Sequence, residues 1–364
     1  MAGDSFSPMT PPSPSLHDLG WRMPAEWEPH QATWMSWPSR KDTSFPDGDH
    51  HDRVLPVFIQ MIEAIAAGET LYLNCTDAED RRFVEQHVSK AAAKNLVITD
   101  IPAVYPWCRD HGAIFVVNDE SGAVAATSWK YNAWGGKYPE AFPDNNISTA
   151  MAKLLGVPEY DAGIVLEGGS IDVNGCGTVL TTESCLLNKN RNPHLAKKDI
   201  ERYLKEYLGQ EKVLWLHDGI VGDDTDGHID DITRFINTET VVTVIEEDES
   251  DVNHVPLMEN YERLCGMSTE DDSPLNIVTL PMPKPVLDDG IRLPASYANF
   301  YIFNEAVLVP VFNDPNDELA LHKLQECFLD RKIIAVDSRS LVWGLGSFHC
   351  LTQQVPAVRA AHHR

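Results

Sequence analysis

Short stretches rich in β-branched residues alternate with amphipathic stretches through almost the whole chain. This alternation predicts strand–helix–strand units, which pack as an α/β fold. Because one kind of unit recurs, a single continuous assembly is favoured, although a length of 364 residues alone suggests roughly two domains. Strands are predicted at 70–75, 95–101, 163–168, 177–182, 212–216, 240–246, 275–281, 306–312 and 332–337, and helices at 78–94, 193–208, 253–266 and 317–329.

The first twenty residues differ from the rest of the chain. Residues 1–20 are rich in proline and serine, so we expect a disordered and dispensable tail. They lack the basic and apolar segments of a signal peptide, and no run of about 18 apolar residues follows that would span a membrane. Seven cysteines without a CxxC pair favour free thiols in a reducing compartment, and a cytoplasmic location is therefore expected.

The net charge of -26, from 29 Lys+Arg against 55 Asp+Glu, limits the partners of the chain. A field of this sign repels nucleic acid and anionic membranes and attracts small cations. The same charge also serves solubility, so it does not identify a cationic ligand on its own.

The most unusual polar stretch is DDTDGHIDDITRF, at 223–235. His228 and Asp230 are two residues apart, so both side chains would lie on one face of an extended backbone. A solvated acidic loop, a catalytic pair and, with Asp226, part of a two-metal manganese site all remain open. The metal interpretation needs a second set of ligands, and the only other candidate is GDHHD at 48–52.

Three further positions are candidates for a site. Asp110 lies at the start of an apolar run, where it is either a turn residue or a site residue, and Cys108 nearby is a rival nucleophile. Gly168–Gly169 between two predicted strands indicates a close backbone approach, but it matches neither phosphate-binding glycine motif. Asn299, among aromatic residues, would alone be an ordinary turn residue.

Cys350 follows a glycine-rich turn close to the end of the sequence. A nucleophilic cysteine needs a separate histidine, and His228 suits this role better than His349, which would face the other side of a strand. Asp110 and Asp230 would raise the pKa of a nearby thiol. They would also hold a guanidinium group, whose positive charge favours the thiolate.

A set of ordered motifs resembles the agmatine deiminase and bacterial peptidyl-arginine deiminase family. The resemblance covers about Met23 to Gln354 and implies the pentein fold, a five-bladed α/β propeller with pseudo-fivefold symmetry, as one domain over residues 21–364. The motifs are MPAEWEPHQATWMSWP, WCRDHGAIFV, YNAWGGKYP, LEGGSIDVNGCGTVLTTESCLLNKNRNP, DDTDGHIDDITRF, LPASYANFYI and GLGSFHCLTQQVP.

The resemblance also implies a mechanism and a set of roles. It makes Cys350 the nucleophile and His228 the general acid/base, while Asp110 and Asp230 grip the guanidinium. No metal or organic cofactor is implied, and the partner is a small cationic guanidino compound; a homo-oligomer is left open. Further residues expected at the substrate are Asn299, Trp134 and Glu167, the last with a structural role as the alternative.

The sequence contains less information about the substrate than about the reaction. Agmatine, giving N-carbamoylputrescine and ammonia, is favoured because 129–142 is aromatic and has no arginine to hold a carboxylate. Because Lys130 and Lys137 lie in that stretch, L-arginine or peptidyl-arginine is the alternative substrate. An amidinotransferase or a manganese ureohydrolase is a more distant alternative function. Departures from the family pattern at Ala113 and at 344–348, which reads GLGSF, put recognition of the distal end in doubt.

Overall fold

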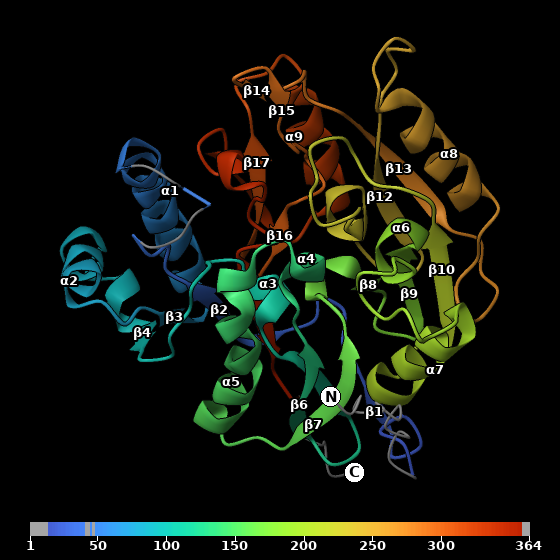
Figure 1. The fold of residues 1–364 in the computed structure, drawn as a ribbon, viewed down its shortest axis with the longest axis horizontal. Coiled ribbons are helices and arrows are strands. Elements are labelled where there is room, and N and C mark those ends of the chain that lie inside the picture. The colour runs from blue at the N-terminus through green and yellow to red at the C-terminus, as the bar shows by residue number, and fades with distance from the viewer. Residues whose placement is uncertain (1–13, 41–43, 46–47, 359–364) are drawn as a thin grey trace, which may run out of the picture.

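The computed structural model describes residues 14–40, 44–45 and 48–358. Within these residues, five mixed sheets share one connection pattern, in which an antiparallel strand joins two parallel strands linked by a helical crossover. The sheets follow one another around the middle of the molecule, and most of the long helices lie on the outside (Figure 1). The predicted α/β class is therefore confirmed.

In four of the five sheets the antiparallel strand is followed along the chain by the first parallel strand, the crossover helix and the second parallel strand. In the remaining sheet the antiparallel strand, β19, comes from the other end of the chain. The sheets and their crossover helices are β19 (Thr352–Pro356), β2 (His30–Ser36), α1 (Gly48–Ala66) and β3 (Thr70–Asn74); β5 (Ile114–Asn118), β6 (Ala123–Lys130), α5 (Ile147–Leu155) and β7 (Glu159–Val165); β8 (Asp172–Val173), β9 (Thr178–Thr182), α7 (Lys197–Leu208) and β10 (Lys212–Leu216); β11 (Thr233–Phe235), β12 (Thr240–Ile245), α8 (His254–Cys265) and β13 (Asn276–Pro281); and β16 (Tyr301–Ile302), β17 (Ala306–Val311), α9 (Asp317–Cys327) and β18 (Lys332–Asp337).

Shorter elements complete the fold. Two strands extend the first two sheets, another pair forms a separate hairpin, and short helical segments occupy the connections. They are β1 (Trp21–Arg22), β4 (Leu96–Thr99), β14 (Leu287–Asp288), β15 (Ile291–Arg292), α2 (Ala78–His87), α3 (Cys108–His111), α4 (Ala133–Gly136), α6 (Glu183–Leu186), η1 (Ala92–Lys94), η2 (Pro139–Asn146), η3 (Gly168–Ser170), η4 (Ile229–Asp231) and η5 (Val342–Gly344).

The crossover helix α7 illustrates how the sequence defines these units. The Asp199 carboxylate accepts a hydrogen bond from the Ala196 N–H at 2.9 Å, so it satisfies a backbone donor at the start of the helix. At the other end Gly209 adopts φ 71°, the left-handed conformation that glycine adopts without penalty. Between these ends one face is apolar, and Tyr203 and Leu204 on it are fully buried against the adjoining sheet.

Most predicted elements overlap elements of the structure, but several differ. The strand predicted at 163–168 ends at Val165, and the helix predicted at 193–208 begins at Lys197. The helix predicted at 78–94 ends at His87, because Val88 is extended, and a short 3-10 turn follows. The strand expected around Cys350 is wrong, because residues 348–350 form a turn and β19 begins only at Thr352. No helix in the described ranges is both long and apolar enough to cross a bilayer.

The predicted tail needs a correction at its end. Residues 1–13 lie outside the described residues, so the prediction stands untested there. Residues 14–20, however, pack on the protein: Leu16 is 1% exposed within an apolar cluster, and the His17 N–H donates to the Glu206 carbonyl at 3.2 Å. Ser15 and Asp18 also bond each other reciprocally through backbone and side chain.

A chain that begins at Trp21 should therefore be less stable than one that begins at Pro14. Burial of a leucine side chain contributes about 1.5–3 kcal/mol, and the free energy of unfolding should fall by about that amount when Leu16 is removed. Denaturant unfolding of both chains measures the difference. Leu16→Ala should reproduce most of it, whereas Leu19→Ala, at a side chain 50% exposed, should change little. Equal stability of the two truncated chains would contradict this account.

Candidate active site

Each of the five sheets contributes the segment that directly precedes its antiparallel strand, and these segments bring the predicted residues together near the centre of the fold. In all five sheets the contributing segment has the same place in the connection pattern, directly before the antiparallel strand. The residues that these segments carry are Asp110 ahead of β5, Gly169 ahead of β8, Asp230 ahead of β11, Asn299 ahead of β16 and Cys350 ahead of β19.

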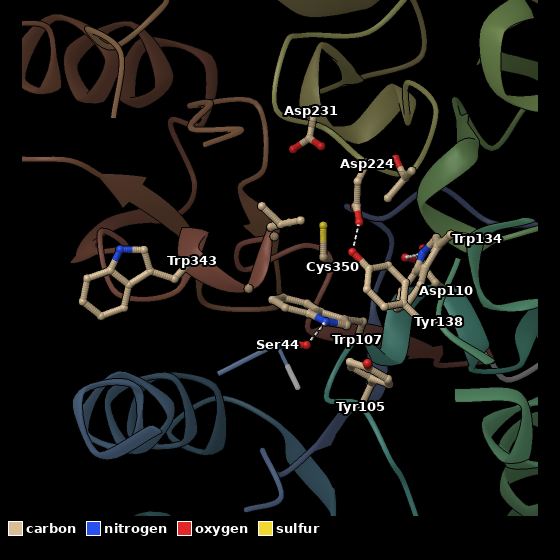
Figure 2. Close-up of a pocket in the computed structure, with 14 residues that line it drawn as sticks. Ser44, Tyr105, Trp107, Asp110, Trp134, Tyr138, Asp224, Asp231, Trp343 and Cys350 are labelled. Carbon is tan, nitrogen blue, oxygen red and sulfur yellow. Dashed lines mark hydrogen bonds between the residues drawn. The ribbon is translucent and has the colours of Figure 1, made fainter. Parts of the chain in front are cut away.

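Cys350 lies at the bottom of a pocket, with its side chain 7% exposed (Figure 2). Its Sγ atom is 3.0 Å from Asn299 Nδ2 and 3.6 Å from Asp230 Oδ2. Burial, and then the charges of Asp230, Asp231 and Asp110, raise the pKa of the Cys350 thiol well above its usual value. Without a bound cation the sulfur therefore stays protonated at neutral pH.

The side-chain amide of Asn299 has a defined orientation. Its Oδ1 atom accepts hydrogen bonds from the backbone N–H groups of His349 at 3.0 Å and Cys350 at 3.4 Å. Because backbone N–H groups can only donate, the amide NH₂ must face the other way, toward Cys350 Sγ and toward Asp231 Oδ1 at 2.9 Å. Asn299 therefore contacts the candidate nucleophile directly, a contact that its place in the sequence did not indicate.

Asp110 is held in the one-turn helix α3 and is fully buried. Trp134 Nε1 donates to its Oδ2 at 2.9 Å, and the Gly169 N–H donates to its Oδ1 at 3.0 Å. Burial raises the pKa of Asp110 to about 6, against the positive charge of His228. The two donors stabilise the carboxylate, so Asp110 can receive a cation from the pocket.

Gly169 confirms the close backbone approach expected from the sequence. A Cβ atom at this position would lie 2.7 Å from His228 Nδ1, 2.8 Å from Asp110 Oδ1 and 3.0 Å from Asp230 Oδ2. Such distances are clashes, so only glycine allows these three polar groups to surround the backbone here.

His228 caps the short 3-10 turn η4, and it is therefore not part of the extended strand that the spacing suggested. Its Nδ1 atom is 3.7 Å from Asp110 Oδ1, and its ring is 1% exposed. Burial opposes a charge on the ring, but Asp110, Cys185 and Asp230 together outweigh it and raise the pKa of His228 well above its usual value. The raised pKa favours the protonated ring, so the His228 imidazole can act as a proton donor.

Asp230 is the most completely buried of the candidate acids, and it is supported from behind by His349. His349 Nδ1 lies 2.6 Å from Asp230 Oδ2, and His349 Nε2 lies 2.8 Å from Glu26 Oε2. Burial opposes ionisation, but the hydrogen bond and charge of His349, followed by the charges of His228 and Arg234, lower the pKa of Asp230 below its usual value. His349 therefore holds the Asp230 carboxylate in place and does not act as the base for Cys350.

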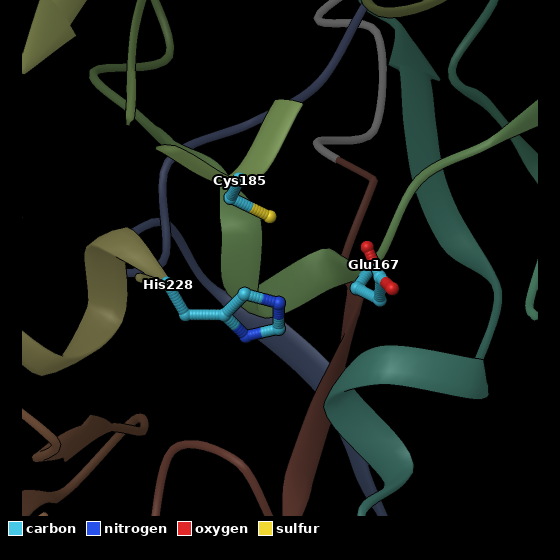
Figure 3. A group of neighbouring side chains, drawn as sticks. All are labelled: Glu167, Cys185 and His228. Carbon is cyan, nitrogen blue, oxygen red and sulfur yellow. The ribbon is translucent and has the colours of Figure 1, made fainter. Parts of the chain in front are cut away.

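Glu167 lies behind His228, on the side away from the pocket. Its Oε1 atom accepts from Arg191 Nε at 2.7 Å, and both side chains are fully buried. Its Oε2 atom is also buried and has no hydrogen-bond partner within the described part of the chain. Figure 3 shows this carboxylate with the Cys185 thiol on one side of the His228 ring.

The pocket above Cys350 has a volume of about 160 Å³. Pockets for drug-sized ligands usually measure about 300–1,000 Å³, so this pocket suits a smaller molecule. Five of its fourteen described lining residues are aromatic, and the charged side chains among them are all acidic (Figure 2). The lining comprises Ser44, Tyr105, Trp107, Asp110, Trp134, Tyr138, Asp224, Thr225, Asp231, Trp343, Gly344, Leu345, Gly346 and Cys350.

Asp224 and Asp231 are pocket residues that the sequence analysis missed. Both lie in the stretch 223–235, but five acidic residues there gave no basis for choosing between them. Asp224 stands opposite Tyr138, whose hydroxyl donates to its carboxylate, and burial raises the pKa of Asp224. The two lysines considered from the sequence point elsewhere: Lys130 pairs with Asp161, and Lys137 bonds residues of the 223–228 loop.

Cys108, the rival nucleophile, faces an apolar cluster and is fully buried. Burial raises the pKa of its thiol to about 12, so Cys108 is a core residue. The metal triplet with Asp226 does not assemble either. Asp226 turns away, at φ 70°, to bond Arg191 at 2.6 Å and Lys137 at 2.8 Å.

Comparisons with known proteins show which family the chain resembles over most of its length. The family model of Porphyromonas-type peptidyl-arginine deiminase matches residues 22–356. A protein of Legionella pneumophila (strain Paris), named "Putative agmatine deiminase", is 37% identical over 340 residues, which are 93% of this chain and 96% of that protein.

Two solved structures are similar over nearly their whole length. The agmatine deiminase of Enterococcus faecalis, described as catalyzing its reaction, has a TM-score of 0.87 and 34% identity, with 94% of this chain and 98% of that chain covered. A cysteine-to-serine variant of the C. jejuni agmatine deiminase, with substrate bound, has a TM-score of 0.84 and 32% identity, with 93% and 97% covered.

Proposed function

Because the chain belongs to the Porphyromonas-type peptidyl-arginine deiminase family, we propose that it hydrolyses agmatine to N-carbamoylputrescine and ammonia. The observation that carries the proposal is the convergence of Cys350, His228, Asp110 and Asp230 from three separate segments. Asp110 and Cys350 line one small pocket, His228 lies beside Asp110, and Asp230 lies beside Cys350. A thiol, an imidazole and two carboxylates are the groups that covalent hydrolysis of a guanidinium requires.

In the first half of the reaction the guanidinium lies between Asp110 and Asp230. Its positive charge offsets the carboxylates that hold the Cys350 thiol protonated, so the thiol releases its proton to solvent as the substrate enters. The hydrogen bond from Asn299 further stabilises the thiolate. The thiolate then forms an S–C bond to the guanidinium carbon, one C–N bond breaks, and His228 gives its proton to the departing ammonia.

The second half of the reaction releases the product. The substrate carbon is now bound to Cys350 as an amidino-cysteine, and His228 has become a neutral base. His228 takes a proton from water, the resulting hydroxide adds to the carbon, and the S–C bond breaks to return the thiolate. The oxygen of this water ends in the ureido group of the product.

The fold that accompanies this function is a five-bladed α/β propeller of the pentein type, with pseudo-fivefold symmetry around the site. Two features support the assignment. Five sheets have the same connection pattern, and the segment ahead of the antiparallel strand in each contributes to the site. The pairing of β19 with β2 joins the two ends of the chain into one sheet, as a closed arrangement of blades requires.

Agmatine is favoured as the substrate by the far end of the pocket. Its described lining offers no arginine or lysine for a carboxylate, but it offers the acid Asp224 beside Tyr138. The terminal ammonium of agmatine would pair with Asp224 and lie against aromatic rings, whereas the carboxylate of L-arginine would face a like charge. L-arginine, which would give citrulline, is thus the second candidate.

Asp224→Asn should raise the KM for agmatine by about 10–100-fold and leave kcat nearly unchanged. A hydrogen bond to a charged group contributes about 1.5–3 kcal/mol, and the terminal ammonium does not take part in the chemistry. Steady-state kinetics with agmatine, L-arginine and a blocked arginine peptide measures the effect. Glu249→Gln removes the same charge from an exposed loop, so it should leave the KM for agmatine unchanged.

The same kinetics tests the choice of substrate. Agmatine should have the highest kcat/KM of the three compounds with the wild-type protein, and Asp224→Asn should narrow the gap to L-arginine. A higher kcat/KM for L-arginine would contradict agmatine as the substrate, while leaving the guanidinium chemistry in place.

A further inference from the structure

A buried cluster behind the pocket contains three different potential metal ligands. Glu167, Cys185 and His228 each offer one ligand atom, and these atoms all lie within 4.8 Å of one another (Figure 3). The three residues come from separate segments: Glu167 ahead of η3, Cys185 in α6 and His228 ahead of η4. The mechanism above uses His228 and gives the Cys185 thiol no role.

The donors in this cluster are not fully satisfied by the protein. Glu167 Oε2 and both ring nitrogens of His228 are buried without a nitrogen or oxygen hydrogen-bond partner in the part of the chain that the structure describes. Buried polar atoms without partners are uncommon in folded proteins. Arg191 occupies only Glu167 Oε1, so the second carboxylate oxygen is free to bind another group.

From this geometry we infer that Glu167, Cys185 and His228 form an inhibitory site for Zn²⁺. Thiolate, imidazole and carboxylate are the three protein ligands of Zn²⁺, with bonds of about 2.0–2.3 Å, so side-chain shifts of about 1 Å would bring all three donors onto one ion. Asp110 and Asp230 near the same histidine add negative charge that attracts a cation when the guanidinium is absent.

Binding of Zn²⁺ would block catalysis through His228. Cys185 and the His228 imidazolium would each release one proton to solvent. Cys185 would then form a thiolate–zinc bond, and the deprotonated imidazole nitrogen would donate its lone pair to the ion. An imidazole that carries a metal on one nitrogen cannot become the doubly protonated imidazolium, which is the proton donor for ammonia in the proposed reaction. This step of the inference rests on the proposed function, but the metal site itself does not.

Cobalt provides a direct test, because Co²⁺ occupies zinc sites and a cobalt–thiolate bond absorbs in the near ultraviolet. Metal-free full-length protein is titrated with Co²⁺, and the absorption of wild type is compared with that of Cys185→Ser, Cys350→Ala and Cys108→Ala. Cys185→Ser preserves the size of the side chain but removes the thiolate. Cys108→Ala is the matched control, since it removes another fully buried thiol.

We expect the thiolate band in wild type, Cys350→Ala and Cys108→Ala, and its loss in Cys185→Ser. With agmatine as substrate, Zn²⁺ should inhibit Cys185→Ser at concentrations more than about tenfold higher than wild type. A band that disappears in Cys350→Ala and persists in Cys185→Ser would place the metal on Cys350, Asp230 and Asp231 and overturn the inference. Absence of any band in wild type would overturn it too. Because the spectrum needs no turnover, a protein inactive on agmatine would refute the proposed function and leave the metal site standing.

Discussion

Replacing Cys350 by alanine should lower kcat for agmatine by about 10⁴-fold or more, because losses of this size follow removal of a covalent nucleophile. The fold should persist, since Cys350 lies in a turn at the pocket floor and, among the described side chains, its Sγ hydrogen-bonds to Asn299 and Asp230. Kinetics together with thermal unfolding separates loss of chemistry from loss of structure. In the wild type, quenching during turnover should also leave a mass adduct on the peptide that contains Cys350.

Cys108→Ala is the matched control for this variant. Its thiol is fully buried against an apolar cluster, so the substitution should cost some stability and leave kcat close to that of wild type. Cys350→Ser, with a poorer nucleophile of similar size, should be nearly as inactive as Cys350→Ala. An inactive Cys108→Ala together with an active Cys350→Ala would reverse the assignment.

Glu26→Gln should destabilise the protein by about 3–5 kcal/mol, the usual cost of removing one partner from a buried ion pair. The Glu26 carboxylate is 4% exposed and contacts Arg234 at 2.9 Å, Arg109 at 3.2 Å and His349 at 2.8 Å. The amide would leave the buried guanidinium of Arg109 without the carboxylate it pairs with, and that of Arg234 with Asp172 as its remaining ion-pair partner. Denaturant unfolding near pH 7 measures the loss, and activity should fall as well, because His349 supports Asp230.

The difference in the free energy of unfolding between wild type and Glu26→Gln should depend on pH, which gives a second test. Burial opposes ionisation of Glu26, but Arg234, His349 and Arg109 outweigh it and lower its pKa well below the usual value. A carboxyl group with a lowered folded-state pKa stabilises the protein above its unfolded pKa of about 4.3, and that contribution is lost as the pH falls. The gap between wild type and Glu26→Gln should therefore narrow in acid.

Glu211→Gln provides the control for Glu26→Gln. Glu211 pairs with Lys205 at the surface and is 43% exposed, and such pairs contribute about 0–1 kcal/mol. If Glu26→Gln unfolded at the same denaturant concentration as Glu211→Gln, the buried cluster around Glu26 would lack the structural importance that its contacts imply.

The sequence predicted the repeated units well because hydrophobic periodicity is a local signal. The strand at 332–337 and the helix at 253–266 agree with β18 and α8 to within one residue at each end. The family resemblance of the motifs also selected candidate side chains, and the structure places Cys350, His228, Asp110 and Asp230 close together; their roles remain predictions.

The predictions were wrong where the direction of a side chain was inferred from residue spacing on the assumption of an extended strand. The rule that neighbours in a strand face opposite sides fails at His349 and Cys350, because 348–350 form a turn. His349 is nevertheless turned toward Asp230 and Glu26, through contacts that no local pattern encodes. His228 and Asp230 approach each other around η4 and not along a strand.

Other features depend on contacts between residues far apart in the chain. Asp224 becomes a pocket residue only because Tyr138, 86 positions earlier, lies opposite it. Glu26 and Arg234 are 208 positions apart in two different motifs, and neither motif indicates that the two side chains pair. Long-range contacts of this kind cannot be read from one sequence. The burial of Leu16 was missed for a different reason, because residues 1–20 were judged by their overall composition and not residue by residue.

Product analysis is the most direct test of the claim that Cys350 and His228 carry out hydrolytic loss of ammonia from a guanidinium group. Wild-type protein is dialysed against a chelator and incubated with agmatine, and ammonia, N-carbamoylputrescine, urea and putrescine are quantified together. The account predicts equal amounts of ammonia and N-carbamoylputrescine, formed at an undiminished rate and without urea. Formation of urea and putrescine, or activity that returns only when manganese is added, would contradict it.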